Sequence, residues 1–194
     1  MTPPARLLRL HRNDLTSLLI LGGYPAARLD VVRAFHAESP VRHGRLVVVD
    51  ARREEASLFQ ALEAWVAARP IQRQCPIGSS DGGTLFIDGI QALGPLTQRM
   101  LLAFSKQVCD PDGEEHWVGR LAAGNDQPLS DAVSDGRFSL ALLDALDKVR
   151  VNMRWGRRDA RSFDVSDTAD SGWSREILAR RRRVSVAVEP AVPS

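Results

Sequence analysis

An aspartate at the end of an apolar run is the first sign of chemistry in this chain. Residues 83–90 read GTLFIDGI, and a continuous apolar run bounded by glycines is typical of a strand buried on both faces. Asp88 follows at the carboxyl end of this strand, where α/β proteins bind ligands and nucleotide hydrolases hold magnesium. Those enzymes place a carboxylate next, to orient the attacking water, and this chain has Gly89. Asp88 is therefore either a remaining metal ligand or a strand-end residue that caps the neighbouring turn.

The elements that must position Asp88 alternate between strand and helix spacing. Strands are predicted at residues 18–21, 46–50, 83–90, 117–123 and 149–153. Helices are predicted at residues 28–37, 54–68, 130–133 and 140–146, with a further one that begins at Pro95. This alternation predicts an α/β fold, with a parallel sheet and helices on both faces.

Composition places the chain among ordinary folded proteins. It has 194 residues, of which 44% are hydrophobic and 26% charged, and its formal net charge is +2. Cys75 and Cys109 lack the spacing of metal ligands, so a reduced cytoplasmic setting is expected. No segment is long enough to cross a membrane.

The character of the sequence changes after the last predicted strand. Residues 1–155 are expected to form one α/β domain. Residues 156–172 are polar and rich in Arg, Asp and Ser, which predicts a linker, and residues 173–183 predict a short basic helix. A loose tail is expected over residues 184–194.

Several motifs in a fixed order resemble those of one family. Residues 22–29 (GGYPAARL) align without a gap with the phosphate loop GESGTGKE, and residues 80–90 (SDGGTLFIDGI) align with ADGGTLFLDEI. Residues 120–125 are similar to a sensor strand RIIAATN, and residues 134–142 to the stretch AEGRFREDL. Over residues 18–149 the chain resembles the sigma-54 interaction AAA+ domain of bacterial enhancer-binding transcriptional regulators. The resemblance implies a three-layer parallel sheet of the P-loop NTPase type.

The phosphate loop departs from the family pattern. Such a loop needs glycines, so that backbone N–H groups can cradle phosphates, and a lysine that reaches the terminal phosphates. Pro25 and Ala27 replace the inner glycines, and Pro25 has no N–H to donate. Arg28 stands at the lysine position, where its planar fork is not equivalent to an ammonium group. We interpret the segment as a strand-to-helix turn that no longer binds nucleotide.

A weak nucleotide site is the alternative interpretation. It would consist of Gly22, Gly23, Arg28, Asp88 and Asn125, with Asp88 as the magnesium ligand. Asn125 matches the sensor asparagine of the family, although Gly-Asn is also a common turn signal. We expect no required cofactor, with ATP and magnesium as the optional ligands.

The contacts that the family makes with other proteins are also reduced. Arg137 matches the first of two arginines that the family uses in trans, and Ser139 stands at the second. The family contacts sigma-54 through a GAFTGA loop, which is missing from residues 55–80. Too few residues follow Val151 for the family's lid and helix-turn-helix module, so both are expected to be absent. Direct remodelling of a sigma factor is therefore not expected.

Three functions remain open. The first is a non-catalytic AAA+-like regulatory protein that binds an intact relative or another regulator, with oligomerisation as one mode. The second is a weak ATP-binding or ATPase module in transcription regulation. The third is nucleic-acid binding through the basic segment, or else a solvated helix face there. That segment contains Arg180, Arg181, Arg182 and Arg183.

Overall fold

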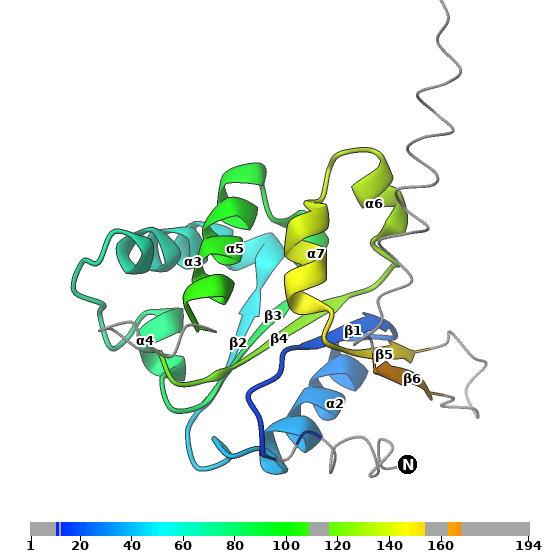
Figure 1. Cartoon of the computed structure of the whole chain (residues 1–194), viewed down its shortest axis with the longest axis horizontal. Helices are drawn as coiled ribbons and strands as arrows, with labels where there is room; N and C mark the ends of the chain where they lie inside the picture. The colour runs from blue at the N-terminus through cyan, green and yellow to red at the C-terminus, as the bar shows by residue number, and fades with distance from the viewer. Residues whose placement is uncertain (1–10, 12, 109–116, 154–162, 168–194) are drawn as a thin grey trace, which may run out of the picture.

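A six-stranded sheet forms the centre of the computed structural model, which describes residues 11, 13–108, 117–153 and 163–167 (Figure 1). The strands are β1 (Leu18–Gly22), β2 (Leu46–Asp50), β3 (Thr84–Asp88), β4 (Arg120–Asn125), β5 (Val149–Met153) and β6 (Phe163–Asp167). The helices are α2 (Pro25–Ala37), α3 (Ala51–Val66), α4 (Pro76–Ser80), α5 (Pro95–Val108), α6 (Ser130–Ser134) and α7 (Leu140–Leu146), with a 3₁₀ turn η1 (Ile90–Ala92).

The sheet order is β2-β3-β4-β1-β5-β6, and the first five strands in this order run parallel. Helix α2 covers one face, while α3, α5 and α7 cover the other, which gives three layers (Figure 1). The predicted α/β fold with a parallel sheet is thereby confirmed. None of the helices in the described part of the chain is long and apolar enough to span a membrane.

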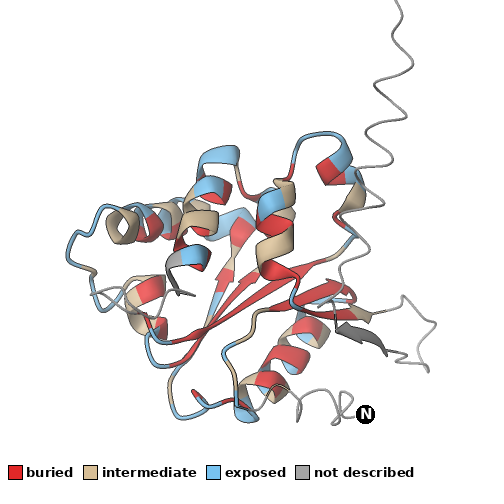
Figure 2. Cartoon of the chain, in the orientation of Figure 1, coloured by how far each residue is buried: buried red, intermediate tan, exposed pale blue. Residues whose placement is uncertain are grey.

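Strand β1 shows why the central strands read as unbroken apolar runs. All five of its residues are buried (Figure 2). Leu18 and Ile20 join the core beneath α2, while Leu19 and Leu21 join the core beneath α3, α5 and α7. Alternate side chains of a strand point to opposite faces, so a strand covered on both faces must be apolar throughout.

Some elements begin elsewhere than predicted. Strand β4 begins at Arg120, not at Trp117, because the Trp117 indole N–H turns into the core and donates to the carbonyl of Ile77 at 3.2 Å. Helix α3 begins at Ala51, since the Asp50 carboxylate accepts from the N–H of Arg52 and caps the helix directly after β2.

Strand β6 lies within the segment predicted to be a linker. It pairs antiparallel with β5, with Val151 opposite Val165. Its sequence FDVSD alternates apolar and polar residues, which is the period of a strand covered on one face. The surrounding arginines and serines outweighed this short signal, so the prediction of a linker was wrong at residues 163–167.

The buried Arg120 joins several segments at the amino end of the sheet. The Arg120 guanidinium lies 3.9 Å from the centre of the Phe35 ring and donates to the Phe35 carbonyl. It also donates to the carbonyls of His11 and Asp14, both at 2.6 Å. Burial lowers the pKa of Arg120 to about 10, which leaves it charged at neutral pH. One side chain therefore joins the start of β4, the end of α2 and the segment before β1.

His36 gives the fold a predicted dependence on pH. Its Nδ1 lies 2.9 Å from the Thr84 hydroxyl. Burial lowers the pKa of His36 below its ordinary 6.5, and the charge of Arg120 lowers it further. The unfolded chain thus binds a proton more readily than the folded one, so the contribution of His36 to stability is complete above pH 6.5.

We expect the free energy of unfolding to decrease as the pH falls below that value toward the folded-state pKa of His36. The measurement is urea denaturation between about pH 7.5 and 5.5, with His36→Gln as the variant that does not titrate. The slope should be smaller in His36→Gln than in the wild type. Equal slopes would contradict this assignment.

Candidate functional site

The predicted site residues lie at the carboxyl edge of the parallel sheet. Gly22 ends β1, Asp88 ends β3 and Asn125 ends β4, and these strands are neighbours through β4. In register, Asp88 lies opposite Gly124, and Leu21 lies opposite Asn125. Ligands of open α/β sheets bind outside the carboxyl ends of the strands, so this edge is the candidate site.

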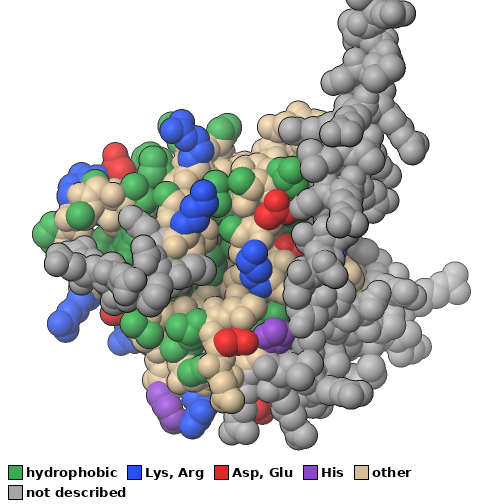
Figure 3. Space-filling view, viewed as in Figure 1, with side chains coloured by type: hydrophobic (Ala, Val, Ile, Leu, Met, Phe, Trp, Pro, Cys, Tyr) green, Lys and Arg blue, Asp and Glu red, His purple; other side chains and the backbone are tan. Residues whose placement is uncertain are grey.

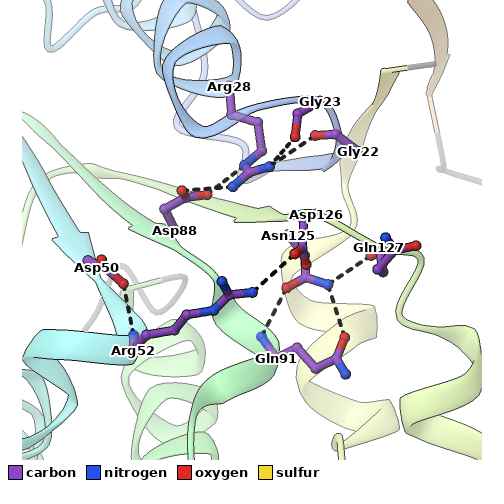
Figure 4. A network of polar contacts seen from close by, with 10 residues as sticks. All are labelled: Gly22, Gly23, Arg28, Asp50, Arg52, Asp88, Gln91, Asn125, Asp126 and Gln127. Carbon is purple, nitrogen blue, oxygen red and sulfur yellow. Dashed lines mark hydrogen bonds and ion pairs between the residues drawn. The ribbon is translucent and has the colours of Figure 1, made fainter. Parts of the chain in front are cut away.

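The centre of the site is an ion pair between Arg28 and Asp88 (Figure 4). Nε of Arg28 donates to Oδ1 of Asp88 at 2.7 Å, and Nη2 donates to Oδ2 at 2.9 Å. The Arg28 side chain is 3% exposed and that of Asp88 15%. This bidentate geometry is the strongest form of an arginine–carboxylate contact. The two charged residues that the sequence assigned to phosphate and magnesium therefore neutralise each other.

The turn after β1 presents acceptors to this guanidinium. Nη1 of Arg28 donates to the carbonyls of Gly23 at 2.6 Å and Gly22 at 3.2 Å. Helix α2 begins at Pro25, so the residues at the inner loop positions are already helical, and the N–H of Arg28 is bonded to the carbonyl of Tyr24. A phosphate cradle needs N–H groups that point inward. This turn instead directs carbonyl oxygens at a cation.

The two glycines of the turn have a packing reason. Gly22 and Gly23 have φ values of +83° and +68°, which favour glycine. A Cβ on Gly22 would lie 2.2 Å from the carbonyl oxygen of Met153 in β5. The close approach of β1 to β5 accounts for Gly22 without reference to a phosphate.

A second arginine lies beside Gly89, the position where hydrolases carry a carboxylate. A Cβ on Gly89 would lie 3.6 Å from Nε of Arg52. Nη2 of Arg52 contacts the Asp126 carboxylate at 3.1 Å (Figure 4). Gly89 has φ +71°, so any other residue there would be strained. The sequence did not indicate Arg52, because only the fold brings α3 beside the end of β3.

Asn125 uses its side-chain amide within the protein. Its Nδ2 donates to Oε1 of Gln91 and to the carbonyl of Gln127, and its Oδ1 accepts from the N–H of Gln91 (Figure 4). The amide therefore holds η1 against the end of β4. Gln91 was another residue that the sequence did not indicate, since no charge or motif marks it.

Arg137 lies on the surface, away from these contacts. Its Nη2 pairs with the neighbouring Asp135 carboxylate at 2.9 Å, and both side chains are more than half exposed. Its carbonyl accepts from Nε2 of the buried Gln98, which also donates to the Leu93 carbonyl and accepts from the N–H of Ser139. Gln98 thus fixes the segment between α6 and α7 to α5.

Two further predictions concern the connection between α3 and α4 and the basic segment near the carboxyl end of the sequence. Helix α3 ends at Val66 and is joined to α4 by residues 67–75, without the family's GAFTGA sequence. The basic segment with Arg180, Arg181, Arg182 and Arg183 lies outside the described residues. On the face seen in Figure 3, the described Lys and Arg side chains are spread singly.

The site residues do not fit a magnesium ion as they stand. Both carboxylate oxygens of Asp88 accept from Arg28. Among the described residues, no group of three or more His, Cys, Asp or Glu side chains could hold a metal. A hard cation at Asp88 would have to displace the guanidinium and find other oxygen ligands.

A cleft of about 270 Å³ opens beside the ion pair. Its walls combine the start of α2 with the ends of β2 and β3 and include apolar and charged side chains. They are formed by Pro25, Ala26, Arg28, Leu29, Val48, Asp50, Arg52, Phe86, Asp88 and Gly89. Among the apolar residues of the wall, Val48 is 44% exposed.

Comparison with known proteins identifies related sequences. A family model described as the sigma-54 interaction domain matches residues 5–152. The transcriptional regulatory protein ZraR of Salmonella typhimurium is 30% identical over 183 residues, which cover 90% of this chain and 41% of ZraR. ZraR of Klebsiella oxytoca is 31% identical over 146 residues, which cover 71% of this chain and 33% of ZraR. The chain thus spans less than half the length of these relatives.

Solved structures share the fold. NtrX from Brucella abortus in complex with ATP has a TM-score of 0.61 at 19% identity, over 76% of this chain and 34% of NtrX. The P-loop NTPase domain of the sigma-54 transport activator from E. coli has a TM-score of 0.50 at 19% identity, over 72% of this chain and 98% of that domain. At these identities the likeness concerns the fold alone.

The ion pair makes a prediction for stability. Arg28→Ala and Asp88→Ala should each lower the free energy of unfolding by about 3 kcal/mol, because each leaves a buried partner uncompensated. The double variant should lose about 2 kcal/mol less than the sum of the single losses. Urea denaturation of the four proteins measures this coupling.

The exposed pair of Arg33 and Asp30, whose side chains are 63% and 64% exposed, provides the matched control. Its coupling should stay below about 0.5 kcal/mol. Additive losses for Arg28 and Asp88 would show that the two side chains do not interact.

Proposed function

The chain belongs to the sigma-54 interaction domain family, and on that premise we propose that it is a non-catalytic member that regulates transcription by binding another protein. The observation that carries this proposal is the ion pair of Arg28 with Asp88, together with the carbonyls of Gly22 and Gly23. These contacts use the groups on which nucleotide hydrolysis depends.

Loss of hydrolysis follows from the chemistry of the step. Phosphoryl transfer depends on positioning and on neutralising charge, through a lysine, a metal held by an aspartate, and a residue that orients water. Arg28 and Asp88 here neutralise each other, and Gly89 has no side chain to orient water. Arg137, at the position of a trans-acting arginine, pairs with Asp135.

Nucleotide binding is opposed by the polarity of the turn. Carbonyl oxygens face the centre of the site, and phosphate oxygens would meet them with like partial charge. The alternative of weak ATP binding is favoured by the cleft beside Arg28 and by the fold shared with NtrX, which was solved in complex with ATP. Nucleotide titration separates the two.

Protein binding is supported by what the fold retains. The described residues form a sheet covered by helices on both faces, and the cleft beside Arg28 includes Val48, which is 44% exposed. AAA+ domains associate side by side into rings, and our proposal is that the present chain uses the same surfaces. A subunit without hydrolysis could enter such a ring and stop it, so an intact relative is the proposed partner.

We expect the wild-type chain not to be stabilised by nucleotide. A site with a Kd of about 50 μM would gain about 2.7 kcal/mol at about 5 mM ATP with magnesium, a rise of several degrees in Tm. A thermal-shift titration measures this, with NtrX as the positive control. A saturable rise in the wild type that is lost in Asp88→Ala would support the nucleotide-binding alternative instead.

Arg28→Ala tests the polarity of the site in the same assay. The substitution leaves two carbonyls and a carboxylate around a vacated guanidinium position, so a few millimolar guanidinium should raise the Tm of this variant and not that of the wild type. ATP should raise neither. Stabilisation of Arg28→Ala by ATP and not by guanidinium would mean that the turn is still an anion site.

Association with an intact relative is the second test of function. The chain should co-elute with ZraR in size-exclusion chromatography and lower its ATPase rate in proportion to the amount bound. Val48→Asp should weaken both the co-elution and the decrease in ATPase rate, because it places a charge on the wall of the cleft. Val118→Asp is the matched control, since Val118 is 50% exposed and precedes β4 at the opposite edge of the sheet. Absence of co-elution and an unchanged ATPase rate would remove the ring-capping mechanism.

A further inference from the structure

A larger hollow of about 540 Å³ lies at the amino edge of the sheet, opposite the ion pair of Arg28. The residues around it precede β2, β3 and β4 or belong to α3, α4 and the connection between them. This volume is within the range of sites for small organic molecules. Nothing in the proposed function uses this part of the molecule.

The inner wall of the hollow is aromatic and aliphatic. Trp65 and Trp117 contribute to it, together with Ile71 and Ile77. Both indoles pack against Phe104: Trp65 meets it edge to face with ring centres 5.5 Å apart, and Trp117 is tilted against it with ring centres 5.1 Å apart. Trp117 is also held by the bonds from its N–H to Ile77 and Ser80. The apolar wall is therefore fixed before any ligand arrives.

The loops that form the rim are tied to the sheet and to each other. The carbonyl of Arg45 accepts from the N–H of Thr84 at 2.8 Å, and the carbonyl of Arg73 accepts from the Ser79 hydroxyl at 2.8 Å. Asp81 accepts the N–H of Val118 at 3.1 Å. Because hydrogen bonds already hold these loops in place, they lose little conformational entropy when a ligand binds, and this favours affinity.

The charge of the rim is predominantly positive. Arg45 and Arg73 line the hollow with exposed side chains, against the single carboxylate of Asp81, and the exposed His43 lies at the same rim. Among the described residues, no ion pair is recorded for the guanidinium groups of Arg45 or Arg73. Arginine suits both contacts that such a rim offers, because it bonds carboxylate or sulfonate oxygens in its plane and stacks on aromatic rings with its face.

We infer that this hollow is a binding site for a small organic anion with a planar aromatic body. The ring of the ligand lies against the wall of Trp65 and Ile71, and its acidic group lies at Arg45 and Arg73. The inference is independent of the state of the nucleotide site, since the two places lie at opposite edges of the sheet.

The test uses the full chain and the fluorescent probe 1-anilinonaphthalene-8-sulfonate. The probe should bind at one saturable site, and Arg45→Glu/Arg73→Glu should weaken binding at least tenfold. Arg33→Glu/Arg99→Glu is the matched control, with two exposed arginines on α2 and α5, and should bind the probe as the wild type does. N-phenyl-1-naphthylamine, which has the rings but no acidic group, should bind at least tenfold more weakly than the sulfonate.

Ile71→Trp provides a second variant that keeps the charges. It fills part of the hollow and should lower the probe's affinity by a similar factor, with the far-UV circular dichroism unchanged. The inference is overturned if the probe does not saturate below about 1 mM, if Arg45→Glu/Arg73→Glu binds it as the wild type does, or if the neutral and charged probes bind equally.

Discussion

The contact between one guanidinium and one carboxylate determines how the carboxyl edge of this sheet is organised. Arg28 reaches from the first turn of α2 to Asp88 at the end of β3 and also binds the carbonyls that follow β1. Two strands and a helix therefore converge on a single buried cation. Burial of such a pair is costly unless its polar groups are hydrogen-bonded, and here each of the three guanidinium nitrogens has at least one acceptor. The ion pair therefore holds the ends of β1 and β3 and the start of α2 together.

Arg120 repeats this arrangement at the other edge of the same sheet. It too is a buried arginine, and it collects carbonyls from His11, Asp14 and Phe35. Between the two arginines, the residues of β1 and β4 are mostly apolar, so these strands have few polar side chains that could hold their ends in place. The two cations supply that fixation: Arg28 joins the turn after β1 to the Asp88 side chain, and Arg120 joins carbonyls of three separate residues. Core packing sets the layers, and the arginines set how the segments terminate.

Much of the fold was readable from the sequence, because parallel strands buried on both faces leave unbroken apolar runs. Residues 46–50, 149–153 and 140–146 formed the elements predicted for them. The contact of Arg28 with Asp88 could not be predicted from the sequence. The sequence places both residues at the carboxyl edge of the sheet, but it does not determine the conformation of a long side chain such as that of Arg28. Helix α2 begins at Pro25, before the predicted start at Arg28, because proline suits the first helical position. Strand β6 was missed because five alternating residues are a weak signal among many charges.

Gly89 has a consequence for how the site could change over time. Its left-handed backbone would strain any glutamate introduced there, and Arg52 already occupies the space beside it. A lysine at position 28 could not hold two carbonyls and a carboxylate in the manner of the planar fork. Glutamate at position 89 or lysine at position 28, introduced alone, is therefore expected to lower the free energy of unfolding. The residues that would take part in chemistry at this edge are thus the same residues that hold the fold together there.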